Sequence, residues 1–475
     1  MTPKGSPGAP SVAVGRAHYL RAMDRIYDLP RFLVGRSEVH RPTTEERLER
    51  IEVTRRFLDD ACPGWRDINV AHVGGTSGKG STAWMLAAIL SRRHRTGLVT
   101  SPHLFDMRER IRVDLEPISR EDLVRVFEGT VVPAAERLCR EDPRFALRFP
   151  EVILATAFAR FLEVGCEWAV VEVVVGGRYD QSNVVLPAAS LVTNVSRDHM
   201  HTLGSRIEQI AFHKAGIAKR GVPLYTSETK SSVLRVLREE AGRVGAPLVQ
   251  VAPEGGTGSA LWFRGRIWEL GMRGGHQRYN AALAVAVALD VARVPASDCA
   301  AALASARMPG RFDERAPRVY ADIAHNAAKM RALAETAAEE LAGRRAVLVV
   351  GIARRKEHAP MLRPLLPLAD NVVFTRARYR GTDPRQLRRL WVSLGGDPAR
   401  ASVEPSPRKA LAKAKRLAGR DGVVVVTGST FVVDEALNPD GWLMRANAEY
   451  RPPGKGLGRG RARGRAAGPR VRGTP

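Results

Sequence analysis

The stretch VAHVGGTSGKGST, residues 70–82, constrains the fold of this chain more than any other feature. A short apolar run leads into its glycines, and an apolar helical pattern follows at once. Strand, tight loop and helix in this order are typical of a phosphate-binding loop, because glycines let backbone N–H groups turn towards an anion and the helix N-terminus adds partial positive charge. Lys79 adds a full charge. The loop departs from the strict Walker form, since Gly80 follows the lysine and the hydroxyl groups come only at Ser81 and Thr82.

The alternation of strand-like and helical runs predicts two α/β domains. The chain has 475 residues, more than one typical core holds. The first set predicts a doubly wound, mostly parallel sheet with a hairpin at its edge over 262–272. A second set begins near residue 309 and predicts a smaller, Rossmann-like domain. The strands we expect are 95–101, 168–175, 190–195, 222–226, 319–323, 346–352, 371–375 and 423–427. The helices we expect are 19–27, 43–58, 120–139, 152–162, 276–292, 327–341, 384–394 and 407–417.

We therefore expect four segments. These are a disordered N-terminus at 1–17, a central domain with the phosphate loop at 18–300, a C-terminal α/β domain at 301–440 and a basic disordered tail at 441–475.

The composition of the chain indicates its cellular compartment and the class of molecule that it binds. The four cysteines are scattered without a CxxC pair, which favours a reducing compartment and argues against disulfides or a zinc site. No run approaches the roughly 20 apolar residues of a membrane span, and residues 1–16 lack the apolar core of a secretory signal, so we expect a cytoplasmic protein. The net charge of +25 suits anionic substrates. Residues 451–475 hold eight Lys or Arg and no aromatic residue for base stacking, so we expect no nucleic-acid partner.

Two polar positions near predicted strand ends fit a magnesium site. Ser101 follows the second predicted strand, where its hydroxyl group could reach a metal ion or a substrate, or simply belong to a Ser-Pro turn. Glu172 interrupts the valine run 170–175, where a strand buried on both faces should be apolar. A lone buried carboxylate is costly unless it is paired or binds a metal. We favour a magnesium ligand at Glu172 over a structural ion pair.

The other polar clusters are weaker signals. His199 could be a metal ligand or an orienting group, although a lone histidine is more often structural. Lys214 looks locally like a helix-end lysine that needs no function. Further polar groups gather at helix starts and strand ends of both predicted domains, which suggests an active site in the cleft between them. These groups are His276, Gln277, Asn280, Arg311, Asp322 and His325.

Taken in order, these motifs resemble those of the folylpolyglutamate synthase/dihydrofolate synthase branch of the Mur ligase family, from about Tyr19 to about Leu437. Residues 75–81 are similar to the phosphate loop of that branch, including the glycine after the lysine. Thr100-Ser101-Pro102-His103 resembles its Ω-loop signature, and Glu172 with residues 176–183 resembles its second signature.

The resemblance implies specific roles for these residues. It implies that Lys79, His199 and Lys214 are catalytic and that Lys214 is carbamylated. The implied metal ligands are Ser101, Glu172, His199 and Lys214, which would hold two Mg²⁺ ions. The implied ATP-binding residues are Gly75, Thr76, Ser77, Gly78, Lys79, Gly80, Ser81, Thr82, Gln277, Asn280, Arg311, Asp322 and His325.

The activity implied is that of an ATP- and magnesium-dependent monomeric ligase that joins L-glutamate to a folate, and also to dihydropteroate, through an acyl phosphate. The chain departs from the family pattern at Ala327, Arg197 and Glu357, and at Leu147–Glu151, which lacks a common threonine. The last departure lies near the expected pterin site. The alternative is therefore a Mur-type amide ligase that acts on a non-folate carboxylate.

Overall fold

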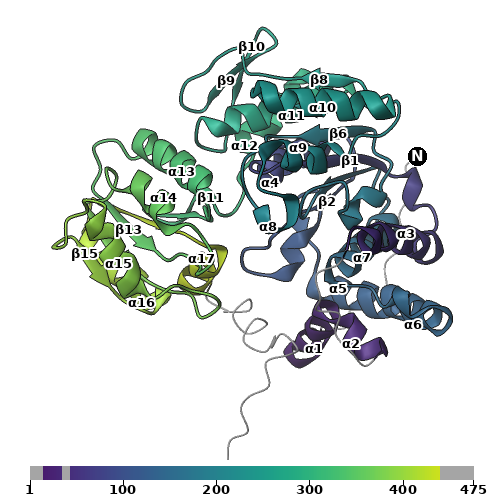
Figure 1. Cartoon of the computed structure of the whole chain (residues 1–475), viewed down its shortest axis with the longest axis horizontal. Helices are drawn as coiled ribbons and strands as arrows, with labels where there is room; N and C mark the ends of the chain where they lie inside the picture. Colours follow the sequence, from purple (N-terminus) through teal and green to yellow (C-terminus); the bar gives the residue numbers. More distant parts are fainter. Residues whose placement is uncertain (1–13, 35–42, 439–475) are drawn as a thin grey trace, which may run out of the picture.

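The computed structural model describes residues 14–34 and 43–438, which fold around two large sheets and a two-stranded one (Figure 1). Most of the expected N-terminal disordered segment and all of the expected basic tail at 441–475 lie outside the described residues. Helix α1 (Arg16–Tyr27) begins inside the segment expected to be disordered. In the described part of the chain, no helix is long and apolar enough to span a bilayer.

The larger sheet has eight strands in the order β4-β3-β2-β5-β1-β6-β7-β8. The pairings from β2 across to β8 are parallel, and β3 and β4 add an antiparallel edge. The predicted doubly wound, mostly parallel sheet is confirmed. The strands are β1 (Asn69–Gly74), β2 (Thr96–Val99), β3 (Ile111–Val113), β4 (Glu116–Pro117), β5 (Trp168–Glu172), β6 (Ala189–Val192), β7 (Leu224–Thr226) and β8 (Leu248–Gln250).

Helices cover both faces of this sheet because successive strand residues point to opposite sides. In β1, Val70 joins the apolar cluster under α1, α3 and α7, whereas Ala71 and Val73 join the cluster under α4, α11 and α12. A further cluster lies under α9 and α10. The bounds of these helices are α3 (Thr44–Ala61), α4 (Lys79–Leu90), α7 (Phe149–Glu163), α9 (Ile207–Ala215), α10 (Ser231–Val244), α11 (His276–Asp290) and α12 (Ala296–Ser305). Two short helices, α2 (Leu29–Val34) and α8 (Met200–Leu203), complete this part.

Three expectations for this part are wrong in detail. The helix expected at 120–139 is α5 (Arg120–Val126), a π-helical turn at Phe127–Val131 and α6 (Val132–Glu141). Pro133 lacks the N–H that would continue the α-helical ladder there. The hairpin β9 (Ala260–Phe263) and β10 (Arg266–Glu269) forms its own sheet, because its apolar side packs against α11. Glu172 ends β5 rather than interrupting it.

The smaller sheet has six strands in the order β11-β12-β16-β13-β14-β15, parallel except for β11. The sequence prediction missed β11 and β15 because both are edge strands without an apolar run. The strands are β11 (Arg311–Ala316), β12 (Val319–Asp322), β13 (Ala346–Val350), β14 (Asn371–Phe374), β15 (Ala401–Val403) and β16 (Val423–Thr427). The helices are α13 (Ala327–Glu340), α14 (His358–Leu362), α15 (Pro384–Ser393), α16 (Pro407–Ala418) and α17 (Thr430–Leu437).

Candidate active site

One cavity of about 980 Å³ takes its walls from both sheets. The larger sheet contributes the segments that follow β1, β2, β5, β6 and β7, and the smaller sheet contributes those that follow β12, β13 and β16. These are the carboxyl ends of parallel strands, where α/β sheets bind ligands. The cavity therefore lies where the sequence predicts an active site.

The glycine-rich loop forms one wall of this cavity, and helix α4 begins at its Lys79. Gly75 has φ +134° and Gly78 has φ +84°. A Cβ atom would lie 1.9 Å from Thr193 Oγ1 at the first position and 2.1 Å from Asn280 Oδ1 at the second. Both positions therefore require glycine. The N-terminus of α4 faces the cavity, which is the arrangement that binds phosphate.

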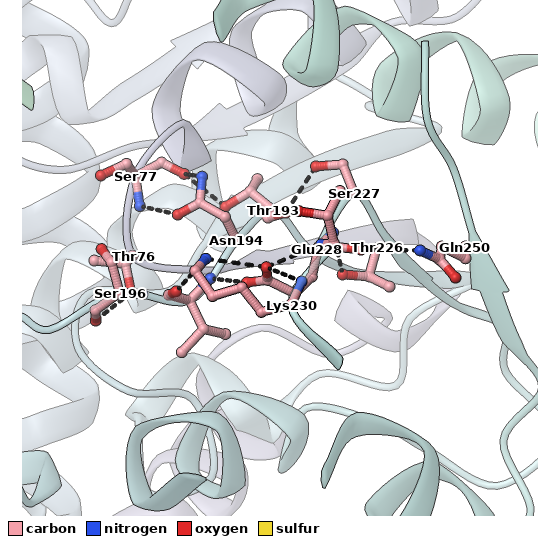
Figure 2. A network of polar contacts seen from close by, with 12 residues as sticks. Thr76, Ser77, Thr193, Asn194, Ser196, Thr226, Ser227, Glu228, Lys230 and Gln250 are labelled. Atoms are coloured by element: carbon pink, nitrogen blue, oxygen red, sulfur yellow. Dashed lines mark hydrogen bonds and ion pairs between the residues drawn. The ribbon is translucent and has the colours of Figure 1, made fainter. Parts of the chain in front are cut away.

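Figure 2 shows the polar contacts that hold the phosphate loop against the end of β6. The Thr76 N–H donates to the Asn194 carbonyl (2.8 Å), and the Ser77 N–H donates to Asn194 Oδ1 (3.2 Å). Asn194 Nδ2 and Thr193 Oγ1 donate to the Ser77 carbonyl at 3.0 and 2.7 Å. The Ser196 N–H donates to Thr76 Oγ1 (3.0 Å). The loop backbone is thus fixed by its neighbours.

Glu228, just after β7, anchors the same segment and is only 2% exposed. Its Oε2 accepts the Val195 N–H (2.7 Å), and its Oε1 accepts the Thr229 and Lys230 N–H groups, both at 2.9 Å, and Lys230 Nζ (3.1 Å) (Figure 2). Burial alone would raise the pKa of Glu228, but these donors outweigh it and lower the pKa below its ordinary value. Sequence analysis missed this residue because nothing in its neighbours marks a buried carboxylate.

Glu172, Ser101 and Lys79 meet beside the phosphate loop. Glu172 Oε2 accepts the Ser101 N–H (2.8 Å), and its Oε1 lies 4.0 Å from Lys79 Nζ. Burial raises the pKa of Glu172, and the Lys79 ammonium opposes that rise. The Glu172 carboxylate and the Ser101 hydroxyl group are the hard oxygen donors that Mg²⁺ prefers, and both residues line the cavity next to the phosphate loop. These residues therefore fit one magnesium ion.

His199 and Lys214 also line the cavity. Lys214 is 3% exposed, and its Nζ donates to the Gly75 carbonyl (2.6 Å). Burial and then Lys79 lower the pKa of Lys214 well below its ordinary value. Burial also lowers the pKa of His199. Within 14–34 and 43–438, no three His, Cys, Asp or Glu side chains are grouped as a metal site. Lys214 would offer a metal an oxygen ligand only as a carbamate.

Arg311, Asp322 and His325 reach the cavity from the smaller sheet. A Cβ atom on Gly80 would lie 3.5 Å from Arg311 Nη2 and 3.5 Å from Glu172 Oε2. The glycine that departs from the Walker form therefore lies between Arg311 and Glu172, within van der Waals reach of both. The Asp322 carboxylate accepts two backbone N–H groups of its own hairpin and turn, at 3.0 and 2.8 Å. Burial raises the pKa of Asp322 to about 6, against the effect of Arg311.

The polar residues predicted at the start of α11, and Thr82 at the end of the phosphate loop, do not all face the cavity. His276 and Asn280 line the cavity, whereas Gln277 and Thr82 do not. Asn280 Nδ2 donates to Gln277 Oε1 (2.9 Å), and Thr82 Oγ1 donates to Asn280 Oδ1 (3.4 Å). Both supporting residues are almost fully buried where α4 packs on α11. They orient Asn280 instead of facing the cavity themselves.

Sequence analysis missed an aromatic and basic end of the cavity. The rings of Tyr27 and Phe149 stack with centroids 4.9 Å apart, and the Arg110 guanidinium lies 5.0 Å from the centre of the Phe149 ring. Arg110 Nε donates to His103 Nδ1 (2.7 Å), and burial lowers the pKa of His103 well below its ordinary value. These residues come from distant segments, so only the Ser-Pro-His motif could have drawn attention to one of them.

The sequence prediction also missed a contact that joins the two sheets across the cavity. Asp198 Oδ2 accepts Asn326 Nδ2 (3.0 Å), and its Oδ1 lies 3.8 Å from Lys356 Nζ. Burial would raise the pKa of Asp198, but nearby cationic groups, including His199 and Lys356, bring it below its ordinary value. The loop that carries His199 is thereby held to the smaller sheet.

Comparisons with known proteins agree with this arrangement. The family described as "Mur ligase, glutamate ligase domain" matches residues 307–430. The chain is 30% identical over 392 residues to a dihydrofolate synthase/folylpolyglutamate synthase of Bacillus subtilis, which covers 78% of this chain and 90% of that relative. A folylpolyglutamate synthase of Mycobacterium tuberculosis complexed with ADP and AMPPCP matches with a TM-score of 0.76 and 29% identity, over 88% of this chain and 98% of that one. A bifunctional folylpolyglutamate synthase/dihydrofolate synthase of Yersinia pestis, complexed with AMPPNP and Mn ion, matches with a TM-score of 0.68 and 26% identity, over 84% and 93%.

Proposed function

The chain belongs to the folylpolyglutamate synthase/dihydrofolate synthase family of Mur ligases and is an ATP-dependent ligase of that type, and we propose that it joins L-glutamate to a folate, and also to dihydropteroate, in the cavity between its sheets. The observation that carries the proposal is the composition of this one cavity. A phosphate loop forms one wall, and a stacked aromatic pair with an arginine lines another part.

The phosphate loop supports the first half of the reaction. The N-terminus of α4 and Lys79 bind and neutralise the β- and γ-phosphates of ATP, and Arg311 adds a second positive charge from the smaller sheet. An oxygen of the substrate carboxylate attacks the γ-phosphorus, ADP leaves, and an acyl phosphate results. The protein contributes mainly by positioning the two reactants and by balancing charge.

We propose that the metal ions of this site are Mg²⁺. Ser101 and Glu172 would hold one ion, and His199 with a carbamylated Lys214 would hold the second. Bound Mg²⁺ supplies charge neutralisation on the phosphate oxygens. The lowered pKa of Lys214 favours the neutral amine that reacts with carbon dioxide. Intact-mass measurement under native conditions should show a mass increase of about 44 Da in the wild type that Lys214→Arg abolishes. A wild type without this increase would refute the second metal site, because that site needs the Lys214 carbamate.

The aromatic end of the cavity supports the choice of acid substrate. Stacked aromatic rings bind flat ring systems, and the Arg110 guanidinium attracts the carboxylate that is to be activated. Glu151, next to the family departure at Leu147–Glu151, is already paired with the buried Arg50 guanidinium and so is not offered to the substrate. Arg148 is the N-cap of α7, and the first residue of this helix, Phe149, lines the cavity.

In the second half of the reaction, the amine nitrogen of glutamate attacks the acyl carbon. The tetrahedral intermediate collapses, phosphate leaves with the electron pair of the C–O bond, and the amine proton passes to solvent. We propose that residues 18–300 and 301–440 act as two domains, and that their closure over ATP excludes water from the acyl phosphate.

The four cysteines are free thiols, which suits a reducing compartment. We therefore place the enzyme in the cytoplasm, and we propose that it acts as a monomer.

The test is to incubate the protein with ATP, Mg²⁺, glutamate and either tetrahydrofolate or dihydropteroate, and to measure product mass. We expect an increase of one glutamate residue that requires ATP, and no product from Lys79→Met. A protein that binds ATP but extends neither acid would refute the folate assignment. A screen of other carboxylic acids and amines for ADP release would then identify the substrate of the alternative, a Mur-type ligase for a non-folate acid.

A further inference from the structure

Lys329, which follows β12 of the smaller sheet, lies among the positive groups of the cavity. Lys329 stands in the first turn of α13 and lines the cavity. Neither local pattern nor the motifs of the chain single it out. The backbone of this turn is fixed by Asn326, whose side chain accepts the Lys329 N–H (2.9 Å).

The tip of the Lys329 side chain is held by His325. His325 Nδ1 lies 2.9 Å from the Ile323 carbonyl, which can only accept, so Nδ1 carries the proton. His325 Nε2 therefore presents a lone pair, and it accepts a hydrogen bond from Lys329 Nζ (3.1 Å). One N–H of the ammonium is used in this way, and the others remain for a ligand in the cavity. Burial, followed by Lys329, lowers the pKa of His325 to about 3, so the ring stays an acceptor.

The charges around Lys329 indicate which ligand it meets. Burial and then Lys79 lower the pKa of Lys329 to about 7, and Arg311 and Lys356 act in the same direction. Asp198 opposes them, and the Lys329 charge is in turn felt at Glu172. Lys79 is thus the strongest charged neighbour of Lys329. Lys79, Arg311 and Lys356 all act on Lys329 in the same direction, and an anion of high charge would balance them.

We propose that Lys329 binds the γ-phosphoryl group of ATP from the side opposite Lys79 and remains with that group as it moves to the substrate carboxylate. This inference rests on the proposed function, because it takes the phosphate loop to hold ATP. The smaller sheet would then contact the γ-phosphoryl group of ATP through Lys329, a contact that ADP cannot make. The alternative ligand for Lys329 is a carboxylate of the incoming glutamate.

The test compares two nucleotides that differ only at the γ-phosphate position. Calorimetry with Mg²⁺ should give dissociation constants for ADP and for AMPPNP in the wild type, Lys329→Met and Lys329→Gln. We expect both variants to weaken AMPPNP binding by about tenfold or more and ADP binding by less than about twofold, since one charge-assisted contact is lost. Lys409→Met, an exposed lysine on α16, is the matched control and should change neither constant.

Each other outcome overturns the inference in a distinct way. Equal weakening of ADP and AMPPNP would mean that Lys329 supports the nucleotide site as a whole. An unchanged AMPPNP constant with a raised KM for glutamate would assign Lys329 to the amino acid. If the wild type binds neither nucleotide, the proposed function itself fails. Thermal melts of both variants check folding, and the glutamine variant gives the answer if the methionine variant does not fold.

Discussion

Replacing Glu228 with glutamine should loosen the support of the phosphate loop. The native carboxylate accepts three backbone N–H groups and the Lys230 ammonium. A glutamine has one acceptor oxygen, so in either orientation its NH₂ group must face at least one of these donors. A lost hydrogen bond to a charged group costs about 1.5–3 kcal/mol, and a buried donor left unpaired costs about 1–3 kcal/mol. We therefore expect the segment after β6 to lose roughly 3 kcal/mol of local stability.

Hydrogen exchange measures this loss where it occurs. Amides in residues 191–199 should exchange at least about tenfold faster in Glu228→Gln, since 1.4 kcal/mol corresponds to a factor of ten. The ADP dissociation constant should rise by about the same factor, because Asn194 in this segment holds the backbone of Ser77. Glu240→Gln is the matched control, because this carboxylate is also buried but its ion pairs are with Arg178 and Arg243, outside residues 191–199. Unchanged exchange in 191–199 of the Glu228 variant would refute the reasoning.

The same contact predicts a pH dependence. The pKa of Glu228 is lower in the folded protein than in the unfolded chain. Its contribution is therefore complete above the unfolded carboxyl pKa of about 4.3 and is lost as the pH falls through the lower folded value. The stability difference between wild type and Glu228→Gln should be constant from about pH 6 to 8 and should shrink below about pH 4. A difference that grows on acidification would contradict this sign.

Three further substitutions test other parts of the cavity and its supports. Arg110→Met should raise the KM for the acid substrate by about tenfold and leave ADP affinity unchanged in calorimetry, because its guanidinium lies over Phe149 at the aromatic end of the cavity, where we place the acid substrate. Glu172→Gln should lower kcat by about 100-fold or more, yet keep or raise the melting temperature in metal-free buffer, because burial already disfavours the carboxylate charge. Arg50→Met should lower the free energy of unfolding, measured by urea denaturation, by about 3–5 kcal/mol, because it leaves the buried Glu151 carboxylate without its partner, and the double substitution Arg50→Met/Glu151→Leu should recover most of this loss.

The sequence alone determined the class of the fold and the identity of the phosphate loop. Apolar runs of strand length, separated by helical patterns, leave few topologies for the larger sheet, and β1 and α4 follow directly from residues 70–90. Ser101 and Glu172 could also be predicted as site residues, because each follows or ends a parallel strand, and the carboxyl ends of parallel strands meet at the same edge of the sheet. The order of all the motifs along the chain gave the family resemblance, which the 30% identity to a known relative confirms.

Only the tertiary structure decided which polar residues face the cavity. Gln277 and Asn280 are three residues apart on one helix, yet only Asn280 lines the cavity, whereas Gln277 is almost fully buried and accepts a hydrogen bond from Asn280 Nδ2. Lys329 and Glu228 belong to no local pattern. The charges that act on Lys329 include Lys79 and Asp198, which are far away in the chain. Glu228 joins the Val195 backbone after β6 to the turn after β7. A buried charge is set by what surrounds it in space, and periodicity along the chain does not contain that information.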